Sequence, residues 1–92
     1  MAKRKQILAR KLISAMDLPE DVILDLPQLK FIGNMELVVE NHKGLYEYTS
    51  SLVKLNVKGC LVSIVGKNLW IQFIGRDDIK IKGRIDKVEF QQ

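Results

Sequence analysis

The chain has 92 residues, of which 47% are apolar and 28% charged, so it allows one small globular domain. It contains no apolar run near the roughly eighteen residues that cross a membrane, and its one cysteine excludes an internal disulfide. The net charge of +4 is uneven: residues 1–16 hold five basic side chains and no acidic one, whereas the remaining ten basic and eleven acidic side chains nearly cancel. We therefore expect any attraction to an anionic partner to come mainly from the first sixteen residues. The lack of a membrane-spanning run and of a disulfide predicts a protein of the cytoplasm.

The first 28 residues are predicted to form a basic amphipathic helix over residues 3–16, followed by a short helical connector. Apolar side chains recur at helical spacing, and most basic side chains fall on the opposite face. Such a helix can lie on an anionic membrane surface, dock into a partner protein, or pack on the protein's own sheet. The residues expected to contact a membrane or partner are Lys3, Arg4, Leu8, Arg10, Lys11, Leu12 and Met16.

From residue 29 to residue 90 the apolar period changes to two, which predicts a β domain. Turn signals divide it into seven or eight short strands, with breaks that include Gly66–Asn68 and Gly83. The alternation is clean over 52–57, where Val53, Leu55 and Val57 should point inward. Two architectures stay open: an antiparallel meander folded into a sandwich, and a compact β-solenoid with glycine at its corners.

The segment Met35–Thr49 carries the clearest turn signal. Two runs of β-favouring residues flank Asn41-His42-Lys43-Gly44, in which asparagine and glycine both tolerate a left-handed backbone. This pattern predicts a β-hairpin that reverses the chain at residues 41–44.

No catalytic or metal site is expected. His42 is the sole histidine and has no cysteine nearby, so a metal site of the usual composition cannot form, and it is predicted to be a solvated turn residue. Neighbouring carboxylates at Asp77 and Asp78 are expected only to shape a turn. Apolar neighbours make Cys60 a buried structural thiol rather than a reactive one. We therefore predict a non-enzymatic protein with no cofactor.

Four aromatic and aliphatic side chains are candidates for an interface patch. If Leu69, Ile71 and Phe73 face the core, the intervening residues of that strand face solvent. Such a patch can bind a protein or drive self-assembly into a ring or coat, and aromatic side chains on a basic β domain can stack nucleic-acid bases. The near-neutral β domain argues against the last alternative. The candidate patch residues are Tyr46, Tyr48, Trp70 and Ile74.

Six short motifs run through the chain in a fixed order. They are DLP (25–27), IGN (32–34), VENHKG (39–44), EY (47–48), IVGKNL (64–69) and KGRIDKVEF (82–90). Together they resemble the YabP/YqfC sporulation family, and its YqfC members most closely.

The resemblance implies a sporulation protein of endospore-forming Firmicutes with no known enzymatic activity. It implies expression in the mother cell and a position in the cytoplasm, peripheral to the outer membrane of the forespore. The gene of YqfD, an integral membrane protein, typically neighbours that of YqfC, so the resemblance also implies YqfD as the protein partner. The family supplies no catalytic residues, and it favours a small β scaffold or adaptor that acts by protein–protein contact.

Overall fold

Residues 25–92, the part of the chain that the computed structural model describes, form one antiparallel sheet in the strand order β1-β2-β6-β5-β4-β3. The prediction of a small, mainly β domain is confirmed. The predicted N-terminal helix lies outside the described residues. The strands are β1 (Gln28–Ile32), β2 (Glu36–Glu40), β3 (Gly44–Tyr48), β4 (Leu52–Val57), β5 (Cys60–Ile74) and β6 (Asp78–Gln91).

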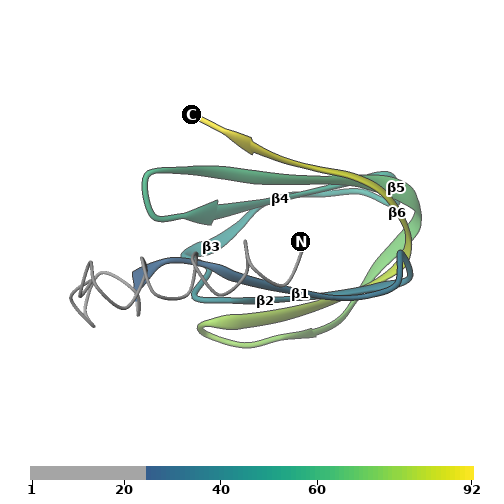
Figure 1. Cartoon of the computed structure of the whole chain (residues 1–92), viewed down its shortest axis with the longest axis horizontal. Helices are drawn as coiled ribbons and strands as arrows, with labels where there is room; N and C mark the ends of the chain where they lie inside the picture. Colours follow the sequence, from purple (N-terminus) through teal and green to yellow (C-terminus); the bar gives the residue numbers. More distant parts are fainter. Residues whose placement is uncertain (1–24) are drawn as a thin grey trace, which may run out of the picture.

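The sheet folds back on itself into two layers. Figure 1 shows β5 and β6 curving together around one end of the molecule, so that each strand runs through both layers. One layer contains β3, β4, the first part of β5 and the last part of β6, and the other contains β1, β2 and the remaining parts of β5 and β6. Every neighbouring pair is antiparallel, which excludes the β-solenoid with its parallel coils.

The described residues form six strands rather than the predicted seven or eight, because two of the predicted glycine-containing breaks bend a strand instead of ending it. The breaks at 66–68 and at Gly83 lie where β5 and β6 turn from one layer into the other. Register shifts between Val65 and Gly66 and between Lys67 and Trp70 mark β-bulges, and a bulge kinks a strand while pairing continues on either side.

The predicted hairpin at residues 41–44 is wrong. β2 pairs with β1 and β6, and β3 pairs with β4, so these residues carry the chain from one layer to the other. The turn chemistry itself is confirmed, since Asn41 and Gly44 have φ values of 66° and 133°. Long-range pairing with β6 takes the place beside β2 that the local signal assigned to β3.

The core lies between the two layers and is made by one face of the sheet. The inward alternation predicted for Val53, Leu55 and Val57 is confirmed. The buried apolar side chains are Leu37, Val39, Val53, Leu55, Val57, Val62, Ile64, Leu69, Ile79, Ile81 and Ile85.

His42 is buried, with 4% of its surface exposed, so its predicted place in a solvated turn is wrong. Its Nδ1 accepts a hydrogen bond from the Gly44 N–H at 3.1 Å, which leaves Nε2 to donate to the Gly75 carbonyl at 3.1 Å. Its backbone N–H donates to the Asp77 carbonyl at 3.1 Å. The imidazole therefore ties the segment that crosses between layers to the turn that joins β5 and β6.

Two backbone contacts allow the bend in β5 and β6. A Cβ atom at Gly66 would overlap the carbonyl oxygen of Arg84. A Cβ atom at Gly83, whose φ is +124°, would lie 2.5 Å from the carbonyl oxygen of Asn68. Only glycine lets the two strands approach this closely.

We expect Gly66→Ala to destabilise the fold by about 3 kcal/mol or more, since the obstacle is backbone and cannot move aside as a side chain can. Gly75→Ala is the matched control, because its Cβ would meet the exposed Phe73 ring at 3.1 Å, which has room to shift, and its backbone is not left-handed. Thermal and urea unfolding measure both changes. A Gly66→Ala protein as stable as wild type would contradict the close contact at the bend.

We expect His42→Ala to lower the free energy of unfolding by about 2–3 kcal/mol, because it removes two hydrogen bonds and leaves a cavity. His42→Asn should cost less, since the asparagine oxygen can still accept the Gly44 N–H. Urea titrations at pH 7 give the ranking. Equal stability of the alanine variant and wild type would show that the imidazole does not hold the two segments together.

Candidate protein-binding groove

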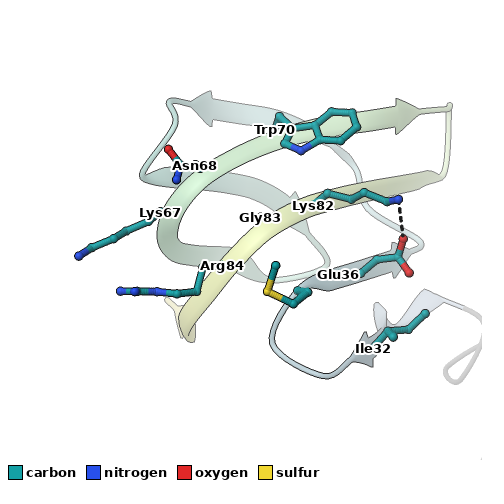
Figure 2. A pocket seen from close by; sticks show the side chains of 9 residues that line it. Ile32, Glu36, Lys67, Asn68, Trp70, Lys82, Gly83 and Arg84 are labelled. Atoms are coloured by element: carbon teal, nitrogen blue, oxygen red, sulfur yellow. Dashed lines mark ion pairs between the residues drawn. The ribbon is translucent and has the colours of Figure 1, made fainter.

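A groove with a volume of about 590 Å³ lies on the outer face of the sheet, at the bend (Figure 2). It is formed by the end of β1, the β1–β2 turn and the parts of β5 and β6 that leave the bend. Its lining residues are Ile32, Met35, Glu36, Lys67, Asn68, Trp70, Lys82, Gly83 and Arg84.

Backbone hydrogen bonds hold the β1–β2 turn against β6 and thereby fix one wall of the groove. The Gly83 N–H donates to the Met35 carbonyl at 3.2 Å, and the Ile85 N–H donates to the Asn34 carbonyl at 2.7 Å. On the opposite wall, Trp70 pairs in register with Lys82. The groove thus collects residues from three separate segments of the chain.

The apolar part of the groove is unusually exposed. Ile32, Met35 and Trp70 have 65%, 58% and 48% of their surfaces accessible to solvent. Single exposed apolar residues are ordinary on a protein surface, but a cluster of large ones edged by charged residues is typical of a binding site.

The charged part is mainly basic. The Glu36 carboxylate is largely covered and lies 3.1 Å from the Lys80 ammonium and 3.7 Å from that of Lys82. Arg84 binds Asp86 through two hydrogen bonds of 3.0 and 3.3 Å. Lys67 forms no ion pair with any residue between 25 and 92. Figure 2 shows Lys82 reaching toward Glu36, while Lys67 and Arg84 extend side by side to one end of the groove.

The residues of the predicted interface patch do not share one face of the sheet. Trp70 faces outward opposite Lys82, and a bulge between Ile71 and Phe73 then reverses the alternation of the residues that follow in β5. Ile74 instead pairs with Ile79, whose side chain is fully buried, and therefore lies on the core side at the open end of the layer. The expectation that Phe73 shares the core-facing side with Leu69 and Ile71 is wrong for this reason.

The two tyrosines of the predicted patch lie on β3 in the other layer, and both are exposed. The Tyr48 hydroxyl accepts a hydrogen bond of 3.3 Å from the Ile71 N–H, and Tyr46 is the extra residue of a bulge opposite β4. Of the four predicted residues, Trp70 is the one that lines the groove. The seven predicted helix residues lie outside the described part of the chain.

Sequence reasoning did not find the groove residues on β1 and β6. The available signal was that each of two predicted breaks places a basic residue directly after a glycine, in Gly66-Lys67 and Gly83-Arg84. The structure pairs Lys67 with Arg84 across neighbouring strands. That pairing requires the bend, which the sequence pattern did not reveal.

The other residues considered in the sequence analysis, Asp77, Asp78 and Cys60, take part in a turn or in core packing. The Asp78 carbonyl accepts the Gly75 N–H at 2.7 Å, so Asp77 and Asp78 shape the β5–β6 turn. Cys60 is half-buried and packs against the core. Between residues 25 and 92, no three side chains of the metal-ligating types converge, and no helix is long and apolar enough to cross a membrane.

Comparison with known proteins identifies the family. The model of the YabP family matches residues 25–92. The chain is 34% identical over 90 residues to the uncharacterized protein YqfC of Bacillus subtilis strain 168, which covers 98% of this chain and 97% of YqfC. No solved structure matches the chain. The resemblance seen in the sequence motifs is confirmed, and the chain belongs to the YabP/YqfC family of sporulation-related proteins.

Proposed function

We propose that this sporulation-related protein is a non-enzymatic adaptor that binds the integral membrane protein YqfD. It acts in the mother-cell cytoplasm, at the outer membrane of the forespore. The observation that carries the proposal is the groove, in which three large apolar side chains remain exposed beside a basic edge. The identity of the partner comes from the family resemblance, and the exposed apolar side chains of the groove support a role in protein contact.

The groove can supply enough free energy for a specific contact. Full burial of a large apolar side chain contributes about 1.5–3 kcal/mol, so covering Ile32, Met35 and Trp70 can offset part of the cost of association. Tryptophan is also among the residues that most often dominate the binding energy of an interface. Lys82 and Arg84 are already engaged by carboxylates, which favours a binding role for the groove over an acid–base one.

We expect the full chain to co-purify in detergent with YqfD of the same organism when the two are co-expressed. Trp70→Ala should lower the affinity at least tenfold, because it removes the largest apolar side chain of the groove. Tyr46→Ala is the matched control, since Tyr46 is also an exposed aromatic residue but lies on β3 in the other layer. Absence of a complex with YqfD would refute the named partner.

The basic N-terminal segment contributes attachment in this proposal, either to the membrane surface or to the partner. We expect that deleting residues 1–16 disperses a fluorescent fusion from the forespore membrane into the mother-cell cytoplasm, since the deletion removes five basic side chains. Microscopy of sporulating cells gives the distribution, and a deletion protein that still folds by circular dichroism is the control. Unchanged localisation would remove the segment from the mechanism.

A further inference from the structure

We infer that the groove binds an acidic protein segment in which carboxylate side chains neighbour a large apolar one. This inference rests on the proposed function and adds the chemistry of the partner. It follows from how charge and apolar surface are divided within the groove.

The basic end of the groove is set up for carboxylates. Lys67 and Arg84 pair in register across β5 and β6, so their side chains start from neighbouring backbone positions. Lys67 has no ion pair within residues 25–92. Arg84 is held by Asp86, but the two side chains are 49% and 41% exposed, and exposed pairs contribute about 1 kcal/mol or less. A second carboxylate can therefore share or replace this contact, and the guanidinium can bind it in a bidentate manner.

The apolar part lies next to the basic end. Trp70 is three residues after Lys67 on β5, and the Met35 carbonyl is hydrogen-bonded to the residue before Arg84. A partner side chain seated on Trp70 or Met35 would thus have its neighbouring residues within reach of Lys67 and Arg84. Burial of the apolar side chain would supply affinity, and the two cations would select acidic neighbours.

The negative charges of the groove argue against a continuous polyanion. Glu36 lies in the groove between the ammonium groups of Lys80 and Lys82, and Asp86 borders the basic end. Nucleic acid or an anionic membrane presents closely spaced negative charges, some of which would meet these carboxylates. A protein segment can place its carboxylates at Lys67 and Arg84 and its apolar side chain beside them.

Trp70 provides a direct test because it is the sole tryptophan of the chain. A library of random 12-residue peptides is selected on the purified full chain, and the enriched peptides are synthesised without tryptophan. Each is titrated while Trp70 fluorescence is recorded. Vesicles with anionic lipid and a single-stranded oligonucleotide are titrated in the same way.

We expect enriched peptides to be acidic around one or two large apolar residues and to shift the Trp70 emission. Lys67→Gln/Arg84→Gln should weaken them at least tenfold, and Arg76→Gln, which changes an exposed arginine in the β5–β6 turn, should not. Matching melting temperatures exclude misfolding of the variants. The inference is overturned if no peptide is enriched or if enriched peptides are neutral or basic. It also fails if the Lys67→Gln/Arg84→Gln protein binds the peptides as tightly as wild type does. It fails as well if the Trp70 emission shifts with vesicles, with the oligonucleotide or on self-association but not with the peptides.

The outcome is separable from that of the co-purification with YqfD. If YqfD binds the Lys67→Gln/Arg84→Gln protein as it binds wild type, the acidic-segment inference fails while the adaptor function stands. If acidic peptides bind the groove but YqfD does not bind the chain, the named partner fails while the chemistry of the groove stands.

Discussion

The close backbone contact between Gly66 and Arg84 is the constraint on which the rest of the structure depends. It lets β5 and β6 bend together, and their bend folds a single sheet into two layers with a core between them. Without the bend, the long hairpin would be a straight ribbon with one apolar face open to water, which is marginally stable at best. The eleven buried apolar side chains found between residues 25 and 92 become a core only because the two halves of the sheet face each other.

The same bend creates the groove. Asn68 takes a left-handed backbone with φ of 54°, and the bulge around it turns Leu69 into the core and Trp70 to the outside. Lys67 and Arg84 lie side by side because they are partners at this point of the ladder. The core and the groove therefore share a cause: the irregularity at the bend buries a leucine on one face of the sheet and presents a tryptophan with basic neighbours on the other.

Local patterns predicted much of this fold correctly. Strict alternation identified the core face of β4. The same rules failed where strand pairing between distant segments determines the topology. The 41–44 turn signal is real in its dihedral angles, but nothing local says that β2 will prefer β6 over β3. Likewise, a glycine that bends a strand and a glycine that ends one give the same sequence pattern.

The candidate site was less predictable, because its residues come from three distant segments. Alternation along the strand correctly predicted that Trp70 faces outward. It wrongly predicted the same for Ile74, because a bulge adds one residue between the two and turns Ile74 to the other face of the sheet. The burial of His42 could not be predicted from local sequence either, because the carbonyl that accepts its hydrogen bond belongs to Gly75, thirty-three residues away in the chain. Bulges and distant carbonyls leave no periodic trace in a sequence.

The length of β5 and β6 has a mechanical consequence. Both strands belong to both layers, so the layers are not independent units joined by a linker but share one ladder of backbone hydrogen bonds. Tension applied at the C-terminal end of β6 would be carried along that ladder as shear through both layers. A sheet built this way would transmit force from one layer to the other without a compliant joint, and it would yield as one cooperative unit.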